Sequence, residues 1–98
     1  MDVDTISAVS RTAIEKILIE IIEDLIQDWG LDLDEPIGKH TKLVANLEFA
    51  SVDVIQLCVA VEEHYGRKMG FQDLLMKDGS YVSDLSIAEI SDFLTSRI

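Results

Sequence analysis

The hydroxyl of Ser51 stands at the start of an apolar run with helical spacing, where a side chain could do chemistry. Ser51 opens the run SVDVIQLCVAVEEHY, in which apolar residues recur at helical spacing. The sequence contains one cysteine, Cys58, and two histidines, His40 and His64. A serine at the start of a helix has three candidate roles: it can cap the helix, act as a nucleophile, or carry a covalently attached group.

The local pattern favours the capping role. Serine is among the commonest residues at a helix N-terminus, because its oxygen accepts a hydrogen bond from an N–H group of the first turn. The reciprocal bond of a capping box is missing, however, since Val54 stands where Glu or Gln would accept it. We therefore expect Ser51 to begin the helix with an incomplete box.

The nucleophilic role is disfavoured. A serine nucleophile needs a general base within hydrogen-bond reach. His64 lies roughly four helical turns beyond Ser51 on the same predicted helix, which is too far. The G-x-S-x-G motif of a nucleophile elbow is also absent. We predict no catalytic residue and expect that the protein is not an enzyme.

Attachment of a phosphate-linked group suits the same position. A helix N-terminus carries partial positive charge and free N–H groups, and both favour a phosphate ester. The helix follows a long predicted loop, residues 31–50, so the hydroxyl should be accessible to another enzyme. Capping and attachment both remain open, and the two roles are compatible.

Predicted helices position this serine. Apolar residues at i, i+3, i+4 and i+7 spacing indicate four helices. The third helix is expected to stop at Asp78–Gly79. Ser86 and Glu89 form a capping box that begins the last helix. No strand pattern of period two competes. The sequence predicts an all-α bundle in a single domain, residues 1–98, with helices at about 5–28, 51–65, 71–77 and 86–97. The residues expected to hold the long loop to the core are Ile37, Leu43, Leu47 and Phe49.

The predicted helix at 51–65 has two kinds of surface. An apolar stripe that must be buried contains Val54, Leu57, Cys58, Val61 and Tyr65. Val52 and Val59 share another direction, beside Gln56 and Glu63. These two valines are either isolated exposed residues or a small apolar spot ringed by acid, which would dock in a partner's apolar pocket with a basic rim.

The charge balance limits the classes of partner. The 98 residues include 19 Asp and Glu against 8 Lys and Arg, for a net charge of -11. Nucleic acid and anionic membranes are poor partners, because they are bound through Lys and Arg, whereas partners with basic patches are favoured. No apolar run approaches the ~18 residues of a membrane span. With one cysteine and no visible export signal, we expect a cytoplasmic protein.

Metal binding is also disfavoured. The acidic run DLDE, residues 32–35, lacks the pattern of a calcium loop, and one cysteine with two histidines argues against a structural zinc site. Cys58 lies on the predicted buried stripe and is expected to be a core residue rather than a reactive thiol.

The run LEFASVDVIQLCVAVEEHYGRKM resembles the core of the acyl carrier protein family. The usual pattern of that family is an acidic residue, Ser and Leu at the start of a helix that continues to a Glu-Glu pair and an aromatic residue. The order of predicted elements also resembles the family's four-helix bundle: a long helix, a long loop, a Ser-led helix, a short third helix and a final helix. The resemblance covers most of the chain.

This resemblance implies a function for Ser51. In the family, the serine receives phosphopantetheine from coenzyme A, and the arm carries acyl groups as thioesters for fatty-acid, polyketide or related biosynthesis. The implied partners are a phosphopantetheinyl transferase and acyl-processing enzymes with basic docking patches, and a monomer is expected. The positions that would face partners are Val52, Asp53, Gln56, Val59 and Glu63. Those that would line an acyl-chain pocket inside the bundle are Leu57, Val61 and Tyr65.

The sequence departs from the family's pattern at the site itself. Ala50 replaces the usual Asp before the serine, Val52 replaces the usual Leu, and Gln56 replaces a frequent Glu. These differences indicate a specialised carrier rather than the housekeeping fatty-acid carrier. The missing Asp also supports an alternative, an unmodified helical module that binds partners through the same face.

Overall fold

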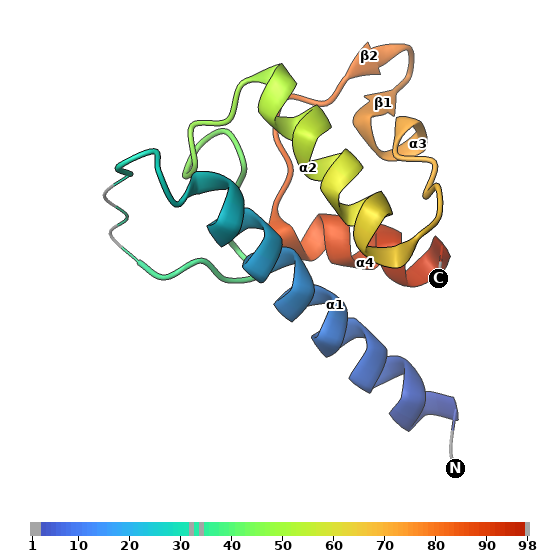
Figure 1. Cartoon of the computed structure of the whole chain (residues 1–98). Helices are drawn as coiled ribbons and strands as arrows, with labels where there is room; N and C mark the ends of the chain where they lie inside the picture. The colour runs from blue at the N-terminus through green and yellow to red at the C-terminus, as the bar shows by residue number, and fades with distance from the viewer. Residues whose placement is uncertain (1–2, 32, 34, 98) are drawn as a thin grey trace.

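The computed structural model describes the backbone of residues 3–31, 33 and 35–97, and the side chains from residue 11 onward within those ranges. This part of the chain is mostly helical, with one small antiparallel hairpin (Figure 1). The helices are α1 (Val3–Ile26), α2 (Ser51–Tyr65), α3 (Gln72–Leu75) and α4 (Ile87–Arg97), and the strands are β1 (Met76–Lys77) and β2 (Ser80–Tyr81). The mostly helical class is confirmed, whereas the prediction of no strand is wrong.

Helix α1 packs against α4 and α2 and contributes one wall of the core (Figure 1). Its buried side chains follow i, i+4 spacing: Ile14, Leu18, Ile22 and Ile26. The helix ends at Ile26, before the predicted end at about residue 28. The cause is a tight turn in which the Trp29 N–H donates to the Ile26 carbonyl oxygen at 3.0 Å, while the Trp29 ring packs against Phe49 with centroids 5.3 Å apart.

Helix α4 closes the core from the other side. The predicted capping box is present: the Glu89 N–H donates to Ser86 Oγ at 3.1 Å, and the Ser86 N–H donates to Glu89 Oε1 at 3.0 Å. The box starts the helix at Ile87, one residue after the predicted start, with Ser86 as its cap. The buried apolar residues that α4 supplies are Ile87, Ile90 and Leu94.

The predicted third helix, 71–77, is wrong at its C-terminal end. Helix α3 stops at Leu75, and β1 pairs with β2 in the register Met76 to Tyr81 and Lys77 to Ser80. Asp78 and Gly79 connect the strands with φ values of 53° and 80°. Two successive residues with positive φ form the tight turn that suits the twist of a hairpin, and Asp-Gly is a preferred pair there. The dipeptide therefore reverses the chain as well as ending the helix.

The segment between α1 and α2 packs as predicted around apolar anchors. Leu43, Leu47 and Phe49 are buried, and Ile37 is partly buried against the core. The segment is also tied by backbone bonds, because the Leu43 N–H donates to the Leu85 carbonyl oxygen at 2.9 Å and the Phe49 N–H to the Leu43 carbonyl oxygen at 3.0 Å. These bonds fix the chain that leads into Ser51.

Candidate functional site

Ser51 is the first residue of α2, and the residue that caps the helix is Ala50. The Ala50 N–H donates to Asp53 Oδ2 at 2.7 Å, and the Asp53 N–H donates to the Ala50 carbonyl oxygen at 3.0 Å. Ala50 has no side-chain acceptor, so only the Asp53 half of a capping box exists. The prediction that Ser51 caps the helix is wrong, because the cap lies one residue earlier and Asp53 supplies the carboxylate that Val54 could not.

The Ser51 hydroxyl is therefore not used to hold the fold. Its side chain is exposed, and within the described part of the chain its hydroxyl has no hydrogen-bond partner. The N–H groups of Ser51 and Val52 likewise donate to no described residue. Together these groups form a free hydroxyl beside unpaired donors at the positive end of a helix, which is a favourable setting for a phosphate ester.

Asp84 braces the loop that precedes this site. Its carboxylate accepts three backbone N–H bonds: from Val44 at 2.8 Å, from Ala45 at 3.0 Å and from Leu85 at 2.8 Å. Partial desolvation by itself would raise the pKa of Asp84, but the three N–H groups and the nearby Lys42 outweigh it, so the pKa is lowered. The carboxylate thus remains charged and engaged with the backbone.

A groove of about 570 Å³ opens directly beside Ser51. It runs between the first turns of α2 and the segment 81–85 that follows the hairpin turn. Its walls are mainly apolar, and Asp84 is the only charged side chain among the described residues that line it. The residues that form it are Leu43, Val44, Phe49, Ala50, Ser51, Val54, Ile55, Leu75, Tyr81, Val82, Ser83, Asp84 and Leu85.

A much smaller void lies deeper, between α2 and α3. Its volume is about 10 Å³, which is about the minimum that holds one water molecule. Leu57 and Val61, two residues predicted to line an acyl-chain pocket, are buried in its wall. Val54 and Leu75 line both the groove and the void, so they form part of the partition between them.

Tyr65, the third residue predicted for that pocket, does not line the void. Its ring is partly buried and lies edge-on to His64, with centroids 5.0 Å apart. The hydroxyl oxygen is buried without a hydrogen-bond partner among the described residues, and desolvation raises the pKa of the Tyr65 hydroxyl. Tyr65 is the last residue of α2 and thus lies at the opposite end of the helix from Ser51.

The residues predicted to face partners lie mostly on the surface of α2. Val52 and Val59 are 59% and 46% exposed, and Gln56 and Glu63 are exposed as well. Asp53 is partly buried and holds the Ala50 N–H group. Ile55, three residues after Val52 and four before Val59 on the same helix, is 53% exposed, so the apolar spot is larger than predicted.

No protein-family model, curated protein or solved structure matches this chain. Among the described residues, no helix is both long enough and apolar enough to cross a membrane.

The site contains little of what nucleophilic catalysis requires. His64 is at the opposite end of α2, and the Asp53 carboxylate is already bonded to the Ala50 N–H. In the part of the chain that the structure describes, no group of three or more His, Cys, Asp or Glu side chains gathers to hold a metal ion. Two positions of the DLDE run, Asp32 and Asp34, lie outside the described residues.

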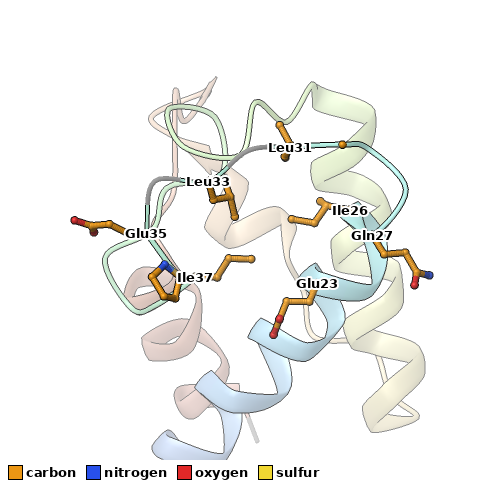
Figure 2. Close-up of a pocket in the computed structure, with 9 residues that line it drawn as sticks. Glu23, Ile26, Gln27, Leu31, Leu33, Glu35 and Ile37 are labelled. Atoms are coloured by element: carbon orange, nitrogen blue, oxygen red, sulfur yellow. The ribbon is translucent and has the colours of Figure 1, made fainter.

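A second hollow, of about 610 Å³, lies between the C-terminal end of α1 and the loop that follows it, and its lining does not include Ser51. Figure 2 shows Ile26 from α1 facing Leu33 and Ile37 from the following loop, with Glu23 and Glu35 at the margins. Leu31, Leu33 and Glu35 form part of its wall, and the positions between them, 32 and 34, lie outside the described residues. We assign no function to this hollow.

Proposed function

We propose that this protein is a carrier of the acyl carrier protein type, with a four-helix bundle as its scaffold and Ser51 as the attachment point of phosphopantetheine. The observation that carries the proposal is the exposed Ser51 hydroxyl, free of hydrogen bonds within the described chain, at the start of α2 and at the edge of an apolar groove. A serine needed only as a cap would have its oxygen bonded to the first turn. The cap here is made by Ala50 and Asp53 instead.

The modification is a phosphoryl-type transfer that a partner enzyme catalyses. Ser51 Oγ attacks the phosphorus that carries the pantetheine of coenzyme A, the phosphoanhydride bond breaks, and adenosine bisphosphate leaves. The serine proton passes to a base of the transferase, because no described residue of this chain places a free base at Ser51. The resulting phosphodiester is stabilised by the α2 dipole and by the N–H groups of Ser51 and Val52.

The partners we propose are a phosphopantetheinyl transferase and acyl-processing enzymes with basic docking patches. The exposed apolar residues Val52, Ile55 and Val59 lie on α2 with Glu63, in a chain of net charge -11. An apolar spot with acidic neighbours is complementary to an apolar pocket with a basic rim, and the charge would speed the encounter. Such docking brings a partner's active site to the start of α2.

Intact mass measures the modification directly. The purified chain is incubated with coenzyme A and a broad-specificity phosphopantetheinyl transferase, and also co-expressed with enzymes of its native pathway. We expect a gain of one phosphopantetheine that is lost in Ser51→Ala. Ser83→Ala is the matched control, because Ser83 is a second exposed serine in the groove wall, and this variant should still be modified. No gain under either condition, or a gain that persists in Ser51→Ala, refutes the carrier function at this residue.

A second candidate is an unmodified helical module that binds partners. It is favoured by the three exposed apolar residues of α2 and by Ala50 at the position where the family usually has Asp. The two functions differ in their dependence on Ser51. If the protein is an unmodified module, its Ser51→Ala variant should bind partners as well as the wild type does. Its Val59→Glu variant should bind them more weakly, with helicity and thermal stability unchanged. Loss of fold in Val59→Glu would instead place Val59 in the core.

A further inference from the structure

The two apolar spaces next to α2 differ greatly in size. The void between α2 and α3 has room for about one water molecule at most, since a water requires roughly 10–15 Å³ of such volume. The groove beside Ser51, at about 570 Å³, lies within the range of about 300–1,000 Å³ that is typical of small-molecule sites. An acyl chain could enter the void only by displacing packed core residues such as Leu57 and Val61.

The groove also has the chemistry of a site for an apolar ligand. Val54, Ile55, Leu75 and Val82 present aliphatic side chains to it. Its single charged group, Asp84, already accepts three backbone N–H bonds, so it is not free to select a cationic ligand. Apolar walls without a free charge favour an uncharged, water-avoiding ligand.

The hairpin supplies the wall that makes this groove. The Asp78–Gly79 turn reverses the chain, so that Tyr81 and Val82 lie across the groove from Ile55 of α2. The Val82 N–H donates to the Leu75 carbonyl oxygen at 2.9 Å, which anchors this wall to the end of α3. Tyr81 is 75% exposed, so its ring provides apolar surface that the protein itself does not cover.

We propose that the apolar acyl group carried on Ser51 is held in this groove, between α2 and the hairpin, and not in the interior of the bundle. This inference rests on the proposed carrier function. It assigns Ile55, Tyr81 and Val82 to cargo binding in place of Leu57, Val61 and Tyr65. It also assigns the cargo class, an uncharged hydrocarbon acyl group rather than a charged or strongly hydrated one.

The test uses the unmodified chain and a free mimic of the loaded arm. The ¹⁵N-labelled protein is titrated with S-octanoyl pantetheine and, separately, with pantetheine, and the amide chemical shifts are followed. We expect shifts that require the octanoyl group at Ile55, Val82 and Ser83, with much smaller shifts at Leu57 and Val61. In Ile55→Glu, a charge in the groove wall should raise the Kd at least about tenfold.

Val59→Glu is the matched control. Val59 is on the same helix with similar exposure, 46% against 53% for Ile55, but it does not line the groove. This variant should bind S-octanoyl pantetheine as the wild type does. If Ile55→Glu loses its helical circular-dichroism spectrum, Tyr81→Ser on the hairpin tests the same groove, and it should also weaken binding.

Three results would overturn the inference: octanoyl-dependent shifts centred on Leu57 and Val61, equal binding by Ile55→Glu and Val59→Glu, or no octanoyl-dependent shifts. The titration does not require modification of Ser51. Absence of mass gain in the coenzyme A experiment therefore refutes the carrier function, whereas absence of groove shifts refutes the groove as the cargo site. The two failures are distinguishable.

Discussion

Replacing Asp84 by alanine should loosen the loop that leads to Ser51. The carboxylate ties together positions 40 residues apart, since it accepts the Val44 and Ala45 N–H groups as well as that of Leu85. Hydrogen bonds to charged groups contribute about 1.5–3 kcal/mol each in protected settings. Asp84 is partly exposed, so water replaces much of this hydrogen-bond energy when the carboxylate is removed. The free energy lost when a helix cap is removed, about 0.5–2 kcal/mol, is therefore the better guide to the effect.

We therefore expect Asp84→Ala to lower the free energy of unfolding by about 1–2 kcal/mol. For a chain of this size the midpoint of thermal unfolding falls by about 4–8 °C for each kcal/mol. Urea and thermal unfolding, followed by circular dichroism, measure both quantities. Asp92→Ala is the control with the same change in net charge. Asp92 pairs with Arg11 at 2.6 Å between exposed side chains, which contributes only about 0–1 kcal/mol.

The dependence on pH provides a second check on Asp84. Its pKa is lower in the folded than in the unfolded chain, because the backbone N–H groups favour the charged form. Its stabilising contribution is thus complete above the unfolded pKa, about 3.9, and is lost as the pH falls through the folded value. The difference between wild type and Asp84→Ala should shrink in acid. Equal stability of Asp84→Ala and Asp92→Ala at neutral pH would refute the reasoning. A difference in stability between wild type and Asp84→Ala that does not change in acid would also refute it.

Three further predictions concern buried or constrained positions. Ser91→Ala should leave the free energy of unfolding unchanged or raise it by up to about 1 kcal/mol, because the fully buried Ser91 hydroxyl has no hydrogen-bond partner among the described residues. Ser96→Ala on the same helix is the comparison, because it makes the same change in helix propensity but also removes the bond that the Ser96 hydroxyl donates to the Phe93 carbonyl oxygen at 2.7 Å. A loss above about 1 kcal/mol in Ser91→Ala would contradict the prediction. Burial, and then the charge of Glu62, raise the pKa of Cys58 to about 12. A thiol reagent at mildly alkaline pH should react with it at least about a hundredfold more slowly than with the unfolded chain, and equal rates would contradict this. Gly79→Ala should lower the free energy of unfolding, measured in urea, by about 1–2 kcal/mol, because the φ angle of Gly79 is 80°. Gly38 has no positive φ, so Gly38→Ala should not destabilise the protein. Equal effects of the two substitutions would contradict the role of the turn.

Features that depend on neighbours along the chain were predictable from the sequence. The observed bounds of α2, Ser51–Tyr65, equal the expected range, and the Ser86–Glu89 box starts α4. The buried residues of α1 likewise recur at the helical spacing that indicates a helix in the sequence. In each case the decisive interactions lie within one or two turns of a helix, so residue order and helical geometry are sufficient.

The hairpin begins from a local signal with two meanings. Asp78–Gly79 is compatible with the end of a helix, and the same pair is also a strong signal for a two-residue hairpin turn. Each strand has only two residues, too few to display an alternating pattern. The tertiary placement of the 81–85 segment beside α2, and hence one wall of the groove, therefore could not be read from periodicity.

For the candidate site, the sequence alone determined that the Ser51 hydroxyl lies at the start of a helix. The tertiary structure decided the rest: Ala50 and Asp53 form the cap, Asp84 braces the preceding loop, and the groove opens beside the hydroxyl. The physical reason is the range of the interactions. A helix start is set by bonds between near neighbours, whereas the brace and the groove arise only when packing brings together segments that are distant in the chain.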